Sequence, residues 1–338
     1  AESGSKEMKL AETATSVMTD YREHYRENWV FMPGGKESCD YWFIREGDTY
    51  HGFFLESDSF AAQREQNIGH MTSRDFLHWE YQGSVLTGKG TDGKWPEGIL
   101  ATGSVIRYNG RFYMLYTGHS ARCGLGLAVS DDLYTWEKVG DGPVNSNDRF
   151  YEAEYEGRSY TCQVLADPYL YPEAIDGWVY AYINSWVKGV PKNSRGAQLM
   201  LRTQDMVHWE PYKIAVQTKD LDRLETAQVW EHGGKWYMYF GGRRVNPDGG
   251  DFEDVESGSY IYAADRFDGP FLRQPWSAVD YKTSRYCYIQ KQMVDPFGDE
   301  VAVTMTPYTG LLWPYKLLYG EDGSVTLEPN RKETTEAK

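Results

Sequence analysis

The sequence predicts an all-β fold, a five-bladed β-propeller, because the chain repeats itself. One eight-residue phrase occurs three times, at residues 73–80, 130–137 and 203–210. Each copy has a hydroxyl residue, an aspartate two residues later, and Trp-Glu beginning four residues after that aspartate. Such repetition indicates a series of like units that can bury their apolar faces only against one another.

A second repeated phrase indicates that the units are sheets rather than helix pairs. A glycine turn leads into an aromatic-rich run at residues 47–54, 110–116, 177–183 and 234–240. Glycine supplies the positive φ that tight hairpin turns need, and aromatic and β-branched residues are typical of strands. With a preceding strand, a following strand and an Asp-turn-Trp edge, each unit matches one four-stranded propeller blade.

The units can be counted along the chain. Four clear units lie near residues 40–81, 101–138, 165–210 and 226–272, and the stretch from Tyr286 to Leu327 has strand-like runs that suffice for a degenerate fifth blade. The alternative is an array of β-sandwiches. That alternative does not explain why the two phrases alternate in the same order.

The propeller is predicted to span residues 31–330 as one domain, because propellers grow by adding blades around a single axis. Residues 1–30 are predicted to form a helical extension, since the apolar residues from Met8 to Tyr25 roughly follow a helical period. This helix is a candidate contact with the propeller or with a second copy of the chain. The polar start, Ala1–Glu7, lacks the apolar segment of a signal peptide, so we expect a cytoplasmic protein, with a processed secreted form as the alternative.

The composition narrows the class of partner. The formal net charge of −15 argues against nucleic acid and anionic membranes, because both require a cationic surface. No apolar run approaches transmembrane length. The aromatic fraction of 15%, with 27 Tyr and 12 Trp, suits sugar rings, whose C–H faces stack on aromatic side chains. We therefore expect an oligosaccharide or another glycoside as the ligand.

Cysteine and histidine do not indicate a metal site. The cysteines are far apart, with no Cys-x-x-Cys pair and no zinc-like spacing, and are expected to be free thiols, with disulfides as the alternative: Cys39, Cys123, Cys162 and Cys287. The histidines near the blades are expected to be buried and hydrogen-bonded rather than ligands: His51, His70 and His119. No cofactor or metal is predicted.

Chemistry is predicted at the axis, because the first strand of each propeller blade lines the central channel. Three of these strands carry an acid near their start: Asp40, Asp167 and Glu225. The second blade offers Thr102 and Ser104 there, and the fifth offers Tyr288 and Gln290. Each acid alone has a structural alternative, a turn for the two aspartates and a surface position for the glutamate. Three acids at one place in the repeat favour a function.

Carboxylates brought together out of water repel one another, so the pKa of at least one of them rises. Glycoside hydrolysis uses carboxyl groups that lie close together and differ in protonation state. One ionised carboxylate acts as nucleophile or base, one protonated carboxyl acts as acid, and a third holds substrate hydroxyls.

Around these acids the chain resembles the five-bladed glycosidase superfamily of glycoside hydrolase families 32, 43, 62 and 68. Residues 68–80 are similar to the Gly-His-x-x-Ser-x-Asp-Leu-x-His-Trp stretch of family 32. Residues 101–105 and 113–118 are similar to its Ser-Gly-Ser-Ala and Tyr-Thr-Gly segments. The resemblance runs from about Trp29 to Phe271.

The resemblance implies a role for each acid. Asp40 corresponds to the nucleophile of family 32 or the general base of family 43, Asp167 to the aspartate that stabilises the transition state, and Glu225 to the general acid. The chain departs from family 32 at the Asn-Asp-Pro-Asn-Gly signature, replaced by residues 39–43, and at the neighbours of the other two acids. An arginine is replaced by Ala166 and a cysteine by Thr226, so fructofuranosides and arabinofuranosides are both candidate substrates.

Further residues are predicted to bind the substrate. Thr102, Ser104 and Gln228 are candidate polar contacts in the channel, and Arg243, with Arg244 as its alternative, is a candidate clamp for sugar hydroxyls. The candidate stacking walls are Trp42, Trp95 and Trp186. For each of these residues, packing within a blade or a surface position is the alternative.

The sequence thus predicts a glycoside hydrolase that is exo-acting on a furanoside of the fructofuranoside or arabinofuranoside type. One alternative is a sugar-binding propeller without catalysis, which needs the aromatic residues but not the acids. Another is a transglycosylase or phosphorylase that uses the same pocket with a different acceptor.

Overall fold

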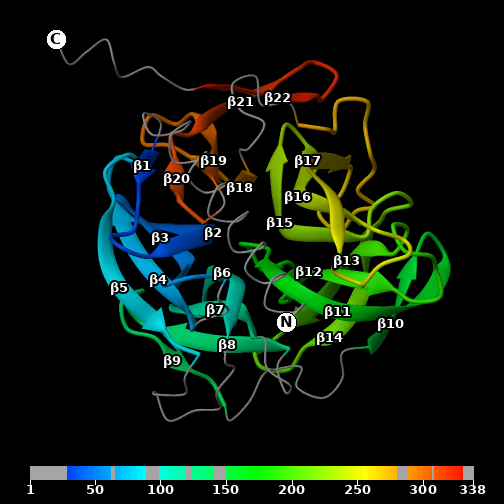
Figure 1. The fold of residues 1–338 in the computed structure, drawn as a ribbon, viewed down its shortest axis with the longest axis horizontal. Coiled ribbons are helices and arrows are strands. Elements are labelled where there is room, and N and C mark those ends of the chain that lie inside the picture. Colours follow the sequence, from blue (N-terminus) through cyan, green and yellow to red (C-terminus); the bar gives the residue numbers. More distant parts are fainter. Residues whose placement is uncertain are drawn as a thin grey trace, which may run out of the picture.

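The computed structural model describes residues 29–61, 65–88, 99–118, 124–140, 150–279, 288–306 and 308–329. These residues form 22 strands in five antiparallel sheets that surround a central axis (Figure 1). The described part holds no helix, and therefore none long and apolar enough to span a membrane. The predicted all-β five-bladed propeller is confirmed. The predicted helical extension lies outside the described residues, except residues 29 and 30, which begin a strand.

Blades one and two have the four strands that the repeat predicts. Blade one contains β2 (Glu37–Glu46), β3 (Thr49–Ser57), β4 (Gln66–Ser73) and β5 (Glu80–Leu86). Blade two contains β6 (Leu100–Tyr108), β7 (Arg111–Gly118), β8 (Leu125–Ser130) and β9 (Glu137–Lys138). The turn glycines Gly47 and Gly110 have φ of 62° and 75°, as the hairpin prediction requires.

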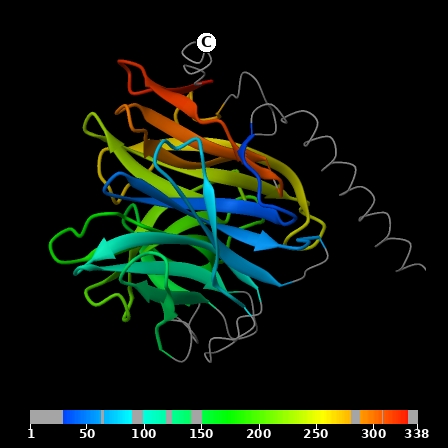
Figure 2. The ribbon, with the colours of Figure 1, turned by 90° about the vertical axis from the view of Figure 1, so that its left-hand side faces the viewer.

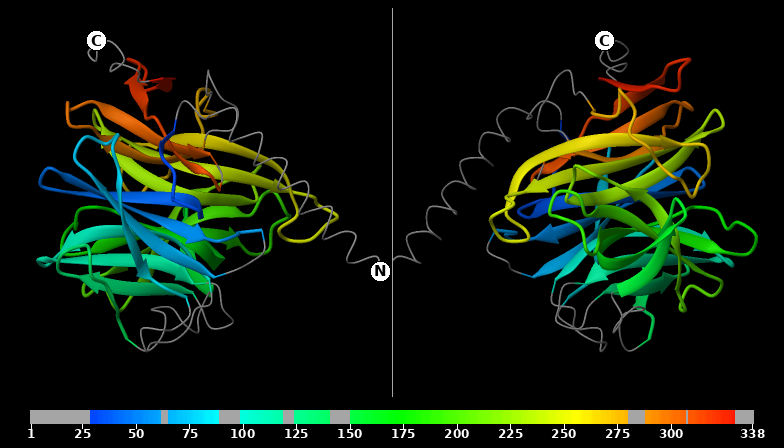
Figure 3. Two further views of the ribbon diagram at one scale, coloured as in Figure 1. Left: turned by 60° about the vertical axis from the view of Figure 1, so that its left-hand side comes forward. Right: turned by 90° about the vertical axis from the view of Figure 1, so that its right-hand side faces the viewer.

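Blades three and four depart from four strands. Blade three has five, because β10 (Phe150–Tyr155) pairs with the first half of the long β11 (Arg158–Leu170), ahead of β12 (Val179–Val187), β13 (Gly196–Thr203) and β14 (Glu210–Gln217). Blade four has three, β15 (Arg223–His232), β16 (Lys235–Val245) and β17 (Asp254–Ala264). Isolated bridges from β17 to Leu272 and Ala278 replace its fourth strand. The long β16–β17 hairpin (yellow) projects at one face of the ring (Figure 3).

The fifth blade closes the ring with both ends of the propeller. It contains β18 (Tyr288–Val294), β19 (Glu300–Thr306), β20 (Gly310–Leu312), β21 (Tyr315–Tyr319) and β22 (Val325–Pro329). The first strand, β1 (Trp29–Phe31), pairs with β20 and so joins this last sheet (Figure 1). A side view shows the blue β1 beside the orange and red strands of this sheet (Figure 2). This pairing gives the ring a hydrogen-bonded closure.

The core lies between the blades. Four clusters of buried apolar side chains fill the interfaces, and each combines residues of neighbouring sheets. In the cluster between blades four and five, for example, Trp230 and Tyr239 share a core with Leu312 and Leu327. The blades therefore stabilise one another, which is what the repetition of the sequence indicated.

Each inner strand carries a β-bulge at an equivalent place. The inner strands β2, β6, β11, β15 and β18 contact one another in cyclic order around the axis. The register of each with its neighbour shifts between Cys39 and Trp42, Ala101 and Gly103, Ala166 and Tyr169, Glu225 and Gln228, and Ile289 and Lys291. A bulge bends its strand and re-aims the side chains beside it. The five bulges thus lie at equivalent positions of the five inner strands, and they mark one height along the channel axis.

The phrase that occurs three times forms the turn between the last two strands of its blade. In blade two, the Ser130 hydroxyl lies 3.1 Å from Asp132 Oδ1, which accepts the backbone N–H of Tyr134 at 2.9 Å and of Thr135 at 2.8 Å. The other two copies make the same backbone bonds. The repeat is therefore a structural turn rather than a binding motif.

We expect the Asp132→Ala variant to lower the free energy of unfolding by about 1 kcal/mol, because two backbone N–H groups lose their acceptor. Urea denaturation at neutral pH measures the change. The matched control is Asp131→Ala in the same turn, where an exposed ion pair with Arg111 is lost and a smaller change is expected. Equal effects of the two variants contradict the assignment of the turn.

Candidate active site

The three acids predicted from the sequence meet in one cavity. Asp40 on β2, Asp167 on β11 and Glu225 on β15 all line a cavity of about 770 Å³. Each lies at the bulge of its inner strand. The φ angles there are 52° at Asp40, 58° at Asp167 and 51° at Thr226, the residue after Glu225. Positive φ is uncommon without glycine and an outlier for a β-branched residue, so the surrounding fold holds this strain.

Asp40 is held by the neighbouring blade. The Thr102 hydroxyl on β6 donates a hydrogen bond to Asp40 Oδ2, and the Asp40 N–H lies 3.3 Å from Met305 Sδ. Burial raises the pKa of Asp40, and the charge of Glu225 raises it further, whereas the bond from Thr102 and the charge of Lys291 oppose the rise. Thr102, which was predicted to contact the substrate, therefore contacts the acid of the neighbouring blade.

Asp167 is hydrogen-bonded to both neighbouring blades. Its N–H donates to Thr117 Oγ1 at 2.9 Å, and its Oδ2 accepts the N–H of Thr226 at 3.2 Å. Burial raises the pKa of Asp167 to about 7, with further contributions from the charges of Asp40 and Glu225. Near neutral pH this carboxyl is therefore available as either a proton donor or an acceptor.

Glu225 lies between two guanidinium groups. Arg243 Nε donates to Glu225 Oε2 at 3.0 Å, and Arg223 Nε donates to Oε1 at 3.2 Å. Arg223 Nη2 also donates to the carboxylate of Asp254, at 2.6 Å from Oδ1 and 2.7 Å from Oδ2. Arg243 was among the predicted residues, whereas Arg223 was not. Its spacing could have revealed it, because residues two apart on a strand share a face.

Lys291 on β18 is a second functional candidate that the sequence did not reveal. Its side chain is only 4% exposed, its Nζ donates to the backbone oxygen of Ala227 at 3.3 Å, and it lies 5.1 Å from the ring centroid of Tyr169. Burial lowers the pKa of Lys291 to about 8, although the charges of Asp40 and Asp167 act in the opposite direction. A buried ammonium group near two buried carboxylates offsets part of their repulsion.

Not all predicted substrate contacts lie at the carboxylates. Trp186 lines the carboxylate cavity with Thr102 and Arg243. By contrast, a second cavity of about 510 Å³, built from the later residues of the same inner strands, is lined by Trp42, Ser104, Gln228 and Lys291. Trp42, Ser104 and Gln228 thus line this second cavity rather than the cavity that the three acids line. Trp95 and the side chains of Tyr288 and Gln290 lie outside the described part.

The remaining predictions concern thiols, histidines and metals. The two cysteines that the structure describes, Cys39 and Cys162, are free and buried, whereas Cys123, Cys287 and His119 lie outside the described residues. His51 Nδ1 and His70 Nε2 are 2.9 Å apart in a buried pair, as expected for hydrogen-bonded histidines. Within the described ranges, no three His, Cys, Asp or Glu side chains are arranged to hold a metal ion.

Comparison with solved structures shows the fold. Levansucrase of Bacillus subtilis superposes with a TM-score of 0.64 at 14% identity, covering 90% of each chain. A β-fructofuranosidase of Bombyx mori gives 0.65 at 16% identity, covering 97% of this chain and 70% of the other. An α-L-arabinofuranosidase of Clostridium thermocellum gives 0.59 at 16% identity, covering 87% of this chain and 94% of the other.

Two sequence relatives come from Escherichia coli. Raffinose invertase is 33% identical over 122 residues, and sucrose-6-phosphate hydrolase is 30% identical over 122 residues. Each match covers 33% of this chain and 24% of the relative. The chain therefore matches about a quarter of the length of these relatives.

The family itself is defined by a longer match. Residues 42–231 match the model of the glycosyl hydrolases family 32 N-terminal domain. This segment covers more than half of the 338 residues and includes Asp167 and Glu225. Asp40 lies just before it, on the strand where the match begins. With the five-bladed ring and its cavity of acids, this match shows that the chain belongs to glycosyl hydrolase family 32.

Proposed function

We propose that the chain is an exo-acting glycoside hydrolase whose substrate is a β-fructofuranoside. The observation that carries this proposal is the meeting of Asp40, Asp167 and Glu225 in one cavity, each at a bulge of a different blade. Family membership supports hydrolysis of a glycosidic bond. Relatives named raffinose invertase, sucrose-6-phosphate hydrolase and β-fructofuranosidase support fructose as the sugar unit.

Asp40 is the proposed nucleophile. Its Oδ2 accepts the Thr102 hydroxyl, which leaves Oδ1 to attack the anomeric carbon of the sugar. The bond from that carbon to the leaving oxygen breaks as a bond to Asp40 forms, and water later releases the sugar from the enzyme. Thr102 favours the ionised form of Asp40, which is the form that attacks.

Glu225 is the proposed general acid, and Asp167 is proposed to accept hydrogen bonds from sugar hydroxyls as positive charge develops on the ring. Arg243 Nε donates to Glu225 Oε2 at 3.0 Å, and the leaving oxygen of the substrate is proposed to take the place of Arg243 at this carboxyl. Arg243 is suited to this movement, since its side chain is 28% exposed, whereas that of Arg223 is only 6% exposed. The released Arg243 then donates to the sugar hydroxyls.

We expect the protein to release sugar from sucrose or another β-fructofuranoside, and the Asp40→Asn variant to lose turnover by on the order of 10⁴-fold, because it lacks the nucleophile. The measurement is sugar release from a panel of nitrophenyl furanosides and pyranosides with sucrose, inulin and arabinan. Asp48→Asn is the control, since Asp48 is an exposed aspartate of the same blade.

Release only from arabinofuranosides overturns the choice of sugar. Binding without release supports a lectin, and an active Asp40→Asn variant refutes the role of Asp40.

We expect the Lys291→Met variant to move the acid limb of the pH–rate profile to higher pH, by on the order of one unit. The positive charge of Lys291 lowers the pKa of Asp40 and of Asp167, so its removal lets both rise further. A nucleophile with a higher pKa needs a higher pH to ionise. Lys291→Arg keeps the charge and is expected to keep the limb in place. Identical profiles for the two variants contradict a charge effect.

The Asp167→Asn variant is expected to be inactive yet more stable than the wild type at alkaline pH. Asp167 has a pKa of about 7 in the folded chain against 3.8 as its ordinary value, so it binds its proton more tightly when folded. Its stabilising contribution is complete below about pH 4 and is lost as the pH rises through about 7. Asparagine does not ionise, so the variant gains roughly 2–4 kcal/mol relative to the wild type at pH 8.

Urea unfolding at pH 4, 6 and 8 measures this difference for Asp167→Asn and for the exposed control Asp48→Asn. The control is expected to follow the wild type at every pH. A variant at Asp167 whose stability relative to the wild type does not change with pH shows that this carboxyl is not held in a costly ionised form.

A further inference from the structure

The stacking wall predicted at Trp186 is not open to a sugar. Trp186 is only 5% exposed, its indole N–H donates to the backbone oxygen of Asp222 at 2.9 Å, and Arg195 Cζ lies 3.7 Å from its ring centroid. Phe252 stacks on the same tryptophan, with centroids 5.4 Å apart and an interplanar angle of 30°. Phe252 is 67% exposed and lines the carboxylate cavity. The ring that a ligand meets at this wall is therefore Phe252.

Phe252 lies on the Glu225 side of the cavity. Its ring centroid is 5.1 Å from Cζ of Arg223, whose Nε donates to Glu225 Oε1 at 3.2 Å. The same guanidinium holds Asp254, two residues after Phe252. Because Glu225 is the proposed donor of a proton to the leaving oxygen, the group attached to that oxygen departs along this side.

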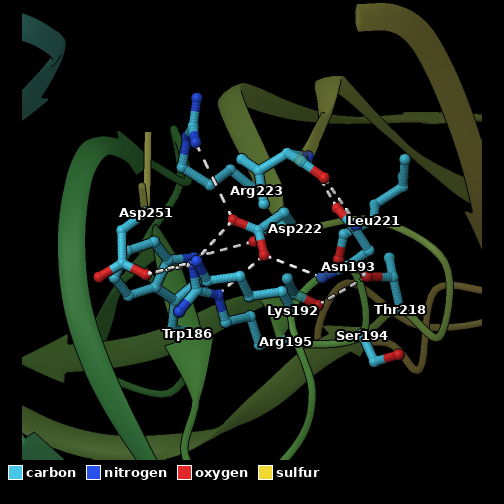
Figure 4. A network of polar contacts seen from close by, with 12 residues as sticks. Trp186, Lys192, Asn193, Ser194, Arg195, Thr218, Leu221, Asp222, Arg223 and Asp251 are labelled. Carbon is cyan, nitrogen blue, oxygen red and sulfur yellow. Dashed lines mark hydrogen bonds and ion pairs between the residues drawn. The ribbon is translucent and has the colours of Figure 1, made fainter. Parts of the chain in front are cut away.

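The turn that carries Phe252 is fixed before any ligand binds. Asp251 accepts a hydrogen bond from Arg195 Nη2 at 3.2 Å and lies 3.6 Å from Lys192 Nζ. Arg195 is in turn anchored on the buried carboxylate of Asp222 at 2.8 Å (Figure 4). These contacts tie the β16–β17 turn to the β12–β13 turn. A surface that is already ordered loses little conformational entropy on binding.

Burial does not account for this phenylalanine. Residues 248–254 read Asp-Gly-Gly-Asp-Phe-Glu-Asp, so Phe252 is the single apolar side chain in a polar turn. With 67% of its surface exposed, it contributes little to stability through burial. An exposed aromatic face at the edge of a cavity suits the apolar C–H face of a sugar ring.

We propose that Phe252 is the stacking platform for the leaving-group sugar and thereby sets the preference for substrates whose leaving group is a sugar ring. This role rests on the proposed function, because it assumes that a glycosidic bond is cleaved at Glu225. The platform acts on the group that leaves and not on the sugar unit that Asp40 attacks. Its effect therefore depends on the leaving group.

The test compares two substrates that share a fructosyl unit, sucrose and methyl β-D-fructofuranoside. Phe252→Ala is expected to lower kcat/KM for sucrose by roughly 3- to 10-fold, the size of one aromatic stacking contact. For the methyl fructoside, which has no second ring, kcat/KM is expected to stay within about 2-fold of the wild type on the same grounds. Phe252→Trp keeps an aromatic face and is expected to restore the activity on sucrose.

Phe297→Ala is the matched control, because Phe297 is 79% exposed and does not line the carboxylate cavity. This variant is expected to leave kcat/KM unchanged for both substrates. Equal losses on both substrates in Phe252→Ala, together with a lower unfolding temperature, assign Phe252 a structural role. A Phe252→Ala variant that keeps the wild-type ratio of kcat/KM for sucrose to kcat/KM for the methyl fructoside also overturns the platform.

The outcomes separate this inference from the proposed function. A wild-type protein that cleaves neither fructoside refutes the choice of fructose by itself, and the comparison is then made with arabinobiose and methyl α-L-arabinofuranoside. A wild type that cleaves no furanoside refutes the hydrolase, and the platform with it. A wild type that cleaves sucrose, with the same substrate preference in Phe252→Ala, refutes the platform alone.

Discussion

The repulsion among three acids in a buried channel is the constraint on which the rest of this structure depends. Burial raises the pKa of Asp40 and of Asp167, and the charge of Glu225 adds to the rise at both. The protein compensates with cations from two directions. Lys291 comes from the last blade beside the channel, whereas Arg223 and Arg243 reach Glu225 from blade four. Charge compensation therefore differs among the three acids, because Glu225 is the one for which a contact with these guanidinium groups is present in the described residues.

The ring provides the stiffness that this arrangement requires. Left-handed backbone at Asp40, Asp167 and Thr226 is unfavourable in an isolated strand and persists only where the surroundings hold it. Here each bulged strand is paired with its own blade and packed on the neighbouring blades through buried apolar clusters. Pairing of β1 with β20 closes the ring. Strain at the site is thus offset by packing far from it.

The departures from the family 32 pattern have a structural counterpart. The arginine that the family places before the middle aspartate is Ala166 in this chain. Positive charge at the cavity comes instead from Arg223 and Arg243, which flank the glutamate. Both guanidinium groups contact Glu225, the proposed proton donor. Phe252 lies beside Arg223, on the side of the cavity that the proposed function assigns to the leaving group.

The sequence by itself determined the number of blades, the inner strands and the three acids, because repeats report local periodicity and turn chemistry directly. The sequence could not show which residues of the channel lie at the same height along its axis. Inner strands alternate sides with a period of two, and each bulge shifts that alternation, so Ser104 and Gln228 line the second cavity while Thr102 contacts Asp40. Tertiary packing also decided that Trp186 is covered, that Phe252 is exposed and that Lys291 is buried where the charges of Asp40 and Asp167 act on it. Burial depends on neighbours distant in the chain, which no local pattern records.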